Sequence, residues 1–212
     1  MLENDSQLKI VYANGVFFEK WVQGLHIQWH LNRFFSGTIG DIQQRLYTTI
    51  PMLSVSCSVM RRDFFDQIGG FDTMSQSNDW VLNIRIFQHL ESRKSFSYIL
   101  EPVFAYRMHD NNISKDFKKM IKLLKEVVDI YIPMEYKNTQ NANIYFFTAL
   151  NAIKSNLYKE SLRLFRISLG FEYHLSRIFI YILAFVSPVS FIARHFPKLF
   201  SFLRKIVQWI AS

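Results

Sequence analysis

The pattern of apolar residues changes near residue 115, and this change limits how the chain can fold. Before that point, apolar runs of strand length alternate with short amphipathic stretches and turn residues. After it, apolar residues recur at helical spacing to the end of the chain. The first helix of this kind would carry, on one face, Phe117, Ile121, Leu124, Val128 and Tyr131. The sequence therefore predicts an α/β region over residues 1–115 and an all-α region over residues 116–212.

Three apolar runs in the first region predict β-strands. They are Leu8–Tyr12, which Asn14-Gly15 would end, Leu53–Met60 and Tyr98–Tyr106. In the second run Val55, Cys57 and Val59 alternate with serines, the pattern of a strand with one buried face. Pro102 in the third run predicts an edge strand or a bulged strand.

Helices are expected between these strands and throughout the second region. Residues 61–68 indicate a short helix that Gly69-Gly70 stops, and Ser77 and Asn78 are good N-cap residues for a helix that runs to about Glu91. One face of that helix would carry Trp80, Ile84, Phe87 and Glu91. Farther along, residues 143–155 and 158–169 predict a helical hairpin that turns at Asn156.

Composition excludes several classes of protein. Half of the residues are hydrophobic and 17% are aromatic, values that a disordered chain does not reach. The single cysteine excludes a disulfide framework and a cysteine-rich zinc site. Because Cys57 lies in an apolar run, we expect its thiol to be buried.

The net charge of +8 comes mainly from the C-terminal quarter of the chain. From Ser161 onwards there are seven lysines and arginines and a single acid, Glu172. Such a segment suits an anionic membrane surface or a nucleic acid. No recognised nucleic-acid-binding module accompanies it, so we expect no nucleic-acid partner.

Two apolar stretches near the C-terminus predict contact with a membrane surface. Lys198–Ile210 would form an interfacial helix with an apolar face, a basic face and Trp209 at its flank. Ile178–Ala193 is uncharged, but it is short for a membrane span and Pro188 interrupts it. The rival interpretation is that these faces pack on the sheet of the first region. The membrane interpretation implies a cytoplasmic protein bound peripherally at the inner face of the membrane.

Four short motifs follow one another after the second predicted strand. They are the basic pair Arg61-Arg62 with its helix, the turn Gly69–Asp72, the helix start Asn78-Asp79-Trp80, and the strand end Tyr106-Arg107-Met108-His109. In this order the motifs resemble the C-terminal half of family 2 glycosyltransferases, which have the glycosyltransferase-A fold. The resemblance covers residues 5–115. It implies a partial glycosyltransferase-A-like mixed sheet with helices packed on it, followed by the all-α region.

The resemblance implies inverting transfer of a sugar from a nucleotide-sugar donor to a glycan or lipid-linked acceptor. Such transfer needs a carboxylate that accepts the proton of the attacking hydroxyl. Asp79 is the candidate, because the dipole and the free N–H groups of a helix N-terminus favour its ionised form. The alternative is a helix-capping aspartate. The family usually has a glutamate before this aspartate, whereas this chain has Asn78.

Other residues of the motifs are candidates for binding the substrates. The resemblance assigns Gly69, Gly70, Asp72 and Trp80 to the acceptor side, and the two glycines allow positive φ angles and a close approach of backbone to ligand. For Asp72, a role in fixing the turn is favoured over contact with the acceptor.

The end of the last predicted strand carries the candidates for the donor phosphates, Arg107 and His109. Arg107 could offset phosphate charge, or it could pair with Asp79 or Glu101. His109 could ligate a divalent metal, approach the donor pyrophosphate, or be an ordinary surface histidine.

One part that family 2 glycosyltransferases need is missing from the sequence. Their N-terminal half binds the nucleotide and carries a metal-binding Asp-x-Asp, and no Asp-x-Asp occurs here. We therefore expect a truncated protein that is inactive alone and whose donor-binding half is a separate partner. Mg²⁺ or Mn²⁺ would be needed by the complete enzyme and not held by this chain alone. The alternative is a non-catalytic membrane-surface or interaction protein with vestigial glycosyltransferase motifs.

Overall fold

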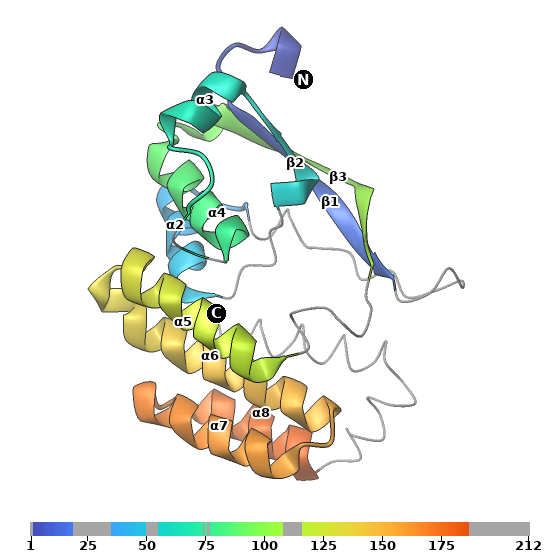
Figure 1. Ribbon diagram of the computed structural model, residues 1–212, viewed down its shortest axis with the longest axis vertical. Coiled ribbons are helices and arrows are strands. Elements are labelled where there is room, and N and C mark those ends of the chain that lie inside the picture. Colours follow the sequence, from blue (N-terminus) through green and yellow to red (C-terminus); the bar gives the residue numbers. More distant parts are fainter. Residues whose placement is uncertain are drawn as a thin grey trace. The chain divides into compact units, whose positions relative to one another are not determined.

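The computed structural model describes residues 2–18, 35–49, 55–73, 75, 77–107 and 116–186. The chain forms two compact units, Met1–Pro133 and Met134–Ser212. Its fold is mixed α/β and mostly helical (Figure 1). The described residues from 116 onwards contain helices and no strand, which confirms the predicted order of an α/β region and an all-α region. The predicted interfacial helix Lys198–Ile210 lies outside the described residues.

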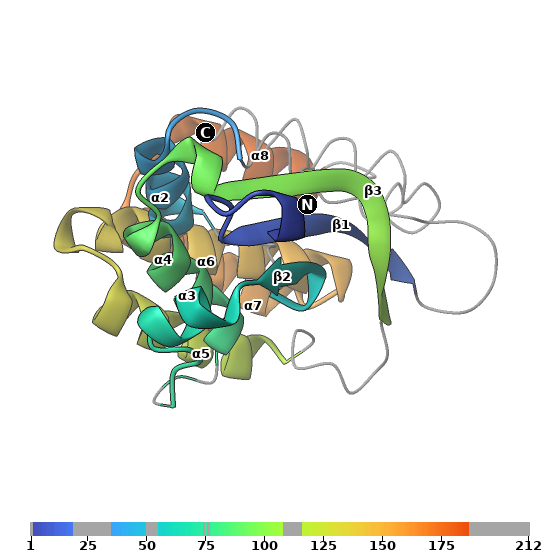
Figure 2. The same ribbon diagram turned by 90° about the horizontal axis from the view of Figure 1, so that it is seen from above.

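A three-stranded mixed sheet lies in the first unit. Its strands are β1 (Ile10–Phe18), β2 (Ser58–Met60) and β3 (Phe96–Arg107). The central strand is β1, with β2 antiparallel on one side and β3 parallel on the other (Figure 2). A parallel pair needs a long connection, and the helices of the first unit that precede β3 lie in that connection.

Strand β1 continues through Asn14-Gly15, where the sequence predicted that it would end. The register between β1 and β3 shifts on both sides of Asn14, which is opposite Pro102. The buried Asn14 side chain stabilises this irregularity, because its Nδ2 donates to the Leu100 carbonyl at 2.9 Å and its Oδ1 accepts from the Gly15 N–H at 3.1 Å. The turn-forming pair thus lies within β1, opposite a bulge in β3. The prediction of an edge or bulged strand around Pro102 is confirmed, since β3 is both.

The prediction of a strand over Leu53–Met60 is wrong for the part before Ser58 that the structure describes. Val55–Cys57 forms the 3-10 turn η2, and only the three residues of β2 pair with β1. The Ser58 hydroxyl donates to the Val55 carbonyl at 2.8 Å and closes the turn, a local bond that competes with strand pairing. Cys57 is buried as expected, whereas Val59 is 66% exposed on its edge strand.

In the part of the first unit that the structure describes, four α-helices and two further 3-10 turns accompany the sheet. They are η1 (Leu2–Asn4), α2 (Ile39–Thr48), α3 (Arg62–Gln67), α4 (Asn78–His89), η3 (Arg93–Ser95) and α5 (Phe117–Tyr131). Helices α3 and α4 confirm the two helices predicted between the strands. No helix was expected at α2, which begins with a capping box between Thr38 and Asp41. Helix α5 belongs to the first unit and packs beside α4.

The core of the first unit joins α4 to the sheet. Trp80, Ile84 and Phe87 share one face of α4 as predicted, and all three are buried. Glu91, the fourth residue of the predicted face, lies beyond the end of the helix and is exposed. The Phe87 ring contacts Phe96 of β3 edge-on at 5.2 Å and Tyr12 of β1 at 6.2 Å between centroids, so aromatic packing holds α4 on this face of the sheet.

The second unit contains the predicted helical hairpin, whose first helix begins nine residues earlier than predicted, and a third helix. Helices α6 (Met134–Lys154) and α7 (Tyr158–Phe171) are joined at Asn156, whose φ of 60° lies in the left-handed region. This conformation suits asparagine better than most residues and confirms the predicted turn. Helix α8 (Leu175–Val186) follows.

Serine hydroxyls and ring stacking connect the helices of the second unit. The Ser161 hydroxyl donates to the Ala149 carbonyl at 2.8 Å, and the Ser168 hydroxyl donates to the Ala142 carbonyl at 2.7 Å. The Tyr181 ring of α8 stacks on a phenylalanine of α7 with 3.8 Å between centroids. Among the described residues, no helix combines the length and the apolar character that crossing a membrane requires.

Candidate functional site

The candidate site includes the turn Gly69–Asp72 and the first turn of α4. Gly69 and Gly70 have φ angles of 79° and 59°, the left-handed backbone that glycine allows. A Cβ atom on Gly70 would lie 3.0 Å from the Phe65 ring, so a side chain there would be both strained and crowded. The turn itself therefore needs these glycines, and their approach to an acceptor stays a prediction.

Arg85 fastens this turn to α4. Its Nη1 donates to the Gly70 carbonyl at 3.2 Å, and its Nη2 lies 3.6 Å from the Asp72 carboxylate, which is buried. With its amide oriented to donate, Asn78 also reaches the Asp72 carbonyl at 2.6 Å. These contacts are those of a residue that fixes a turn, the role favoured for Asp72, and contact of Asp72 with an acceptor stays a prediction.

The basic pair before the turn contacts neighbouring chain segments. Arg61 Nε donates to the Leu8 carbonyl at 2.8 Å, just before β1. Arg62 pairs with Asp66 at 2.9 Å on the exposed side of α3. The two arginines thus connect the start of α3 to the sheet and to the next turn of the same helix.

Asp79 is the second residue of α4 and is exposed, while Ser77 occupies the N-cap position. Its backbone is anchored to the sheet through Asn83. Asn83 Nδ2 donates to the Asp79 carbonyl at 2.7 Å, and Asn83 Oδ1 accepts from the Tyr12 hydroxyl at 2.7 Å. Both Asn83 and Tyr12 are buried, and burial raises the pKa of Tyr12 above its ordinary value. The Tyr12 hydroxyl therefore stays protonated and donates to Asn83, and this bond fixes the start of α4 on β1.

The Cys57 thiol lies within electrostatic range of the Asp79 carboxylate. Burial, and after it the negative charge of Asp79, raises the pKa of Cys57 to about 11. A Cβ atom on Gly15 would lie 3.5 Å from the Cys57 sulfur and 3.4 Å from the Phe104 ring, so η2 packs against β1 at the point opposite the bulge of β3. The exposed carboxylate at the start of α4 thus lies near a neutral thiol that packs on Gly15 of β1.

Several residues of this site could not be found from their own sequence positions. Arg85 is the only lysine or arginine between Asn78 and Leu90, and this isolation within an apolar helical pattern was the one available signal. Tyr12 and Asn83 carried no signal, because their pairing depends on how α4 packs on the sheet. The nearness of Cys57 to Asp79 depends on η2, which took the place of a predicted strand.

The structure brings only some of the predicted site residues together. Trp80 is 4% exposed and its indole N–H donates to the Leu46 carbonyl at 3.0 Å, so the ring packs between α4 and α2. Its role in acceptor binding stays a prediction. Arg107 is the last residue of β3 and its backbone pairs with Phe18 of β1. The structure does not describe the side chain of Arg107. His109, the predicted metal and donor ligand, also lies outside the described residues.

A metal centre would need several ligands close together. In the described part of the chain, no three side chains of His, Cys, Asp or Glu are grouped as a metal ion would require. Compared with known proteins, the chain matches no protein-family model and no curated protein sequence. The sequence motifs and the geometry around Asp79 are therefore the features that indicate a function.

Proposed function

We propose that the chain is the acceptor-side part of an inverting glycosyltransferase similar to family 2, with a glycosyltransferase-A-like fold. It would move a sugar from a nucleotide-sugar donor to a glycan or lipid-linked acceptor. The observation that carries this proposal is the attachment of the Gly69–Asp72 turn to α4 by Arg85. This attachment joins two of the four motifs into one element that also bears the candidate base, Asp79.

In the proposed reaction, the Asp79 carboxylate accepts the proton of the acceptor hydroxyl while the hydroxyl oxygen bonds to the anomeric carbon of the donor. The bond from that carbon to the donor phosphate breaks, and its electron pair leaves with the nucleoside diphosphate. The exposure of Asp79 supports this role, since the acceptor must reach the base. The bonds from Asn83 to the Asp79 carbonyl and the Tyr12 hydroxyl also support it, because they hold the base in one place.

The donor would be held mainly by a partner. The sequence has no Asp-x-Asp, and the described residues contain no cluster of metal ligands. We therefore assign the nucleotide and its Mg²⁺ or Mn²⁺ to a donor-binding half that joins this chain. From this chain, Arg107 is the proposed contact to the donor phosphates, and His109 is a proposed contact to the phosphates or the metal. The proposed action of Asp79 does not pass through the metal.

A lipid-linked acceptor would put the protein at the cytoplasmic, inner face of a membrane as a peripheral protein. A second candidate function shares this location: a non-catalytic membrane-surface protein with vestigial glycosyltransferase motifs. The observation that favours it is the exposure of apolar side chains on α8, where Leu175 is 72% exposed. The two candidate functions lead to different expectations, because only the glycosyltransferase has a turnover and that turnover would need Asp79.

The test supplies the donor-binding half of a family 2 glycosyltransferase, fused to the chain or as a separate protein. Release of nucleoside diphosphate from sugar nucleotides is measured with a bacterial membrane fraction as acceptor. Asp79→Asn should lower turnover by a factor on the order of 10² to 10⁴ and leave donor affinity unchanged. The matched control is Asp63→Asn, an exposed aspartate in the first turn of α3.

Wild-type turnover in Asp79→Asn would rule out Asp79 as the base. Loss of turnover in Asp63→Asn as well would show that the change acts on folding and not on proton transfer. If no combination of halves releases nucleoside diphosphate while the chain still binds membranes, the non-catalytic candidate is favoured.

A further inference from the structure

Helix α8 presents an apolar face to solvent. Leu175, Phe179 and Ile182 are 72%, 63% and 50% exposed. Because successive residues of a helix are about 100° apart, these three side chains lie within about 60° of one another around the helix axis. We call them the α8 stripe. Tyr173, just before the helix, is also exposed, by 66%.

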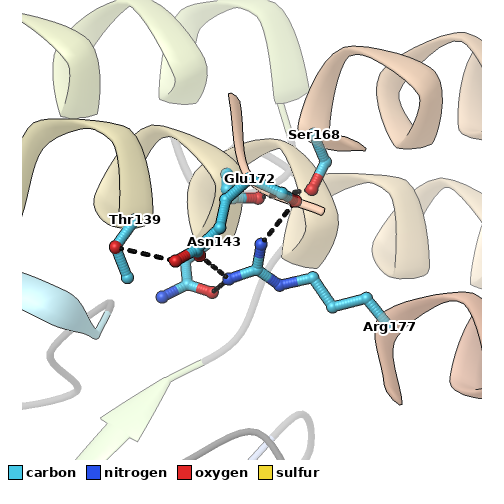
Figure 3. A network of polar contacts seen from close by, with 6 residues as sticks. Thr139, Asn143, Ser168, Glu172 and Arg177 are labelled. Carbon is cyan, nitrogen blue, oxygen red and sulfur yellow. Dashed lines mark hydrogen bonds and ion pairs between the residues drawn. The ribbon is translucent and has the colours of Figure 1, made fainter. Parts of the chain in front are cut away.

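The only charged residue of α8 points away from this stripe. Arg177 is 4% exposed, and its Nη2 donates to the Glu172 carboxylate at 2.8 Å and to Asn143 Oδ1 at 2.9 Å (Figure 3). Its Nη1 donates to the Glu172 carbonyl at 3.2 Å, and the Thr139 hydroxyl donates to the Glu172 carboxylate at 3.1 Å. The charge of Arg177 is thus neutralised inside the second unit, and the exposed side of α8 is uncharged.

The second unit, which carries the stripe, is positively charged. Residues 134–212 include ten lysines and arginines and three acids, a net charge of +7. Lys159 and Arg166 of α7 are exposed. Glu172, the only acid from Ser161 onwards, is engaged by Arg177. An uncharged apolar stripe therefore belongs to a positively charged unit.

We propose that the α8 stripe docks on an anionic lipid surface. Its side chains would lie at the boundary of headgroups and acyl chains, as in other interfacial helices, and the positive charge of the unit would favour the anionic headgroups. Charge favours lipid over a second copy of the chain, because two copies docked through this face would bring like charges together. The inference rests on the part of the proposed function that puts the protein at a membrane and not on glycosyl transfer.

Flotation of the full chain with lipid vesicles tests the docking. The wild-type chain should float with vesicles that contain phosphatidylglycerol at low salt, and less with phosphatidylcholine alone or at high salt. Leu175→Ser with Phe179→Ser should weaken binding on the order of 10-fold or more, since two apolar side chains no longer enter the bilayer. Ile182→Ser provides an independent variant of the same stripe.

The matched control is Met134→Ser, which removes an apolar side chain that is 78% exposed on α6 of the same unit. It should float like the wild type, and circular dichroism should show native helix content in every variant. The proposal would be overturned if the wild-type chain did not float with anionic vesicles, or if the stripe variants floated as well as the wild type.

Static light scattering tests whether a second copy of the chain binds the stripe instead of lipid. A dimer that the stripe variants abolish, without vesicle binding by the wild type, would assign the stripe to a second copy and overturn lipid docking. Asp79→Asn should leave flotation unchanged. Failure of docking and failure of the proposed base are therefore distinguishable.

Discussion

The Arg85 guanidinium lies 3.6 Å from the Asp72 carboxylate, with the two side chains 25% and 5% exposed. This pair connects the turn that ends α3 to the middle of α4. The same guanidinium donates to the Gly70 carbonyl, so the turn cannot move independently of the helix that begins at Asn78. A site that uses both the turn and Asp79 would depend on this connection.

Arg85→Ala should lower the free energy of unfolding by about 1–3 kcal/mol. The buried Asp72 carboxylate would lose its cation, and the turn carbonyls would lose a donor. Urea unfolding of the full chain measures the change. The control is Arg62→Ala, because Arg62 and Asp66 form an ion pair in which the side chains are 85% and 56% exposed, and its loss should leave the free energy of unfolding almost unchanged. Equal effects of the two substitutions would contradict the role given to Arg85.

Gly70→Ala should destabilise the first unit by about 1–2 kcal/mol, because an L-residue is strained at φ 59° and the new Cβ would meet Phe65. The opposite sign is expected for Gly170→Ala in α7, where nothing lies within 4 Å of an added Cβ. That change should stabilise by about 0.5–1 kcal/mol through helix propensity. Thermal unfolding of both variants measures the two changes in stability. If Gly70→Ala unfolds at the same temperature as the wild type, the turn does not need its left-handed backbone.

The reactivity of Cys57 should report the charge of Asp79. With a pKa of about 11, the thiol is almost fully protonated at pH 8, and its alkylation by iodoacetamide should become faster as the pH rises towards 11. Asp79→Asn removes a negative charge that disfavours the thiolate. The pKa should therefore fall and alkylation at pH 9 should become faster, as mass spectrometry can follow. Asp63→Asn should leave the alkylation rate unchanged. An unchanged rate in Asp79→Asn would show that the charge of Asp79 does not act on the Cys57 thiol.

The purified chain alone should not bind sugar nucleotides with micromolar affinity. The reason is the missing Asp-x-Asp. Isothermal titration calorimetry with UDP-glucose and UDP-N-acetylglucosamine, each with and without Mn²⁺, provides the measurement. Metal-dependent micromolar binding would show that the chain holds the donor by itself and would remove the need for a separate donor-binding half.

Local signals were sufficient for several elements. The Gly-Gly stop after α3 and the asparagine at the turn between α6 and α7 act within a few residues of the chain. The sequence alone therefore determined these helix ends and the order of an α/β part and an all-α part. Ser77 occupies the predicted N-cap position of α4, which puts Asp79 in the first turn as expected, although the Ser77 side chain makes no cap hydrogen bond.

Contacts between distant segments decided the rest. Asn14-Gly15 has the composition of a turn, yet pairing keeps it inside β1 opposite the bulge of β3, and η2 forms where alternation predicted a strand. The pairing of Arg85 with Asp72 and the nearness of Cys57 to Asp79 likewise depend on how α4 lies on the sheet. Such contacts join residues whose spacing carries no periodicity, and their energy exists only once both segments are packed. Only the tertiary structure could therefore decide them.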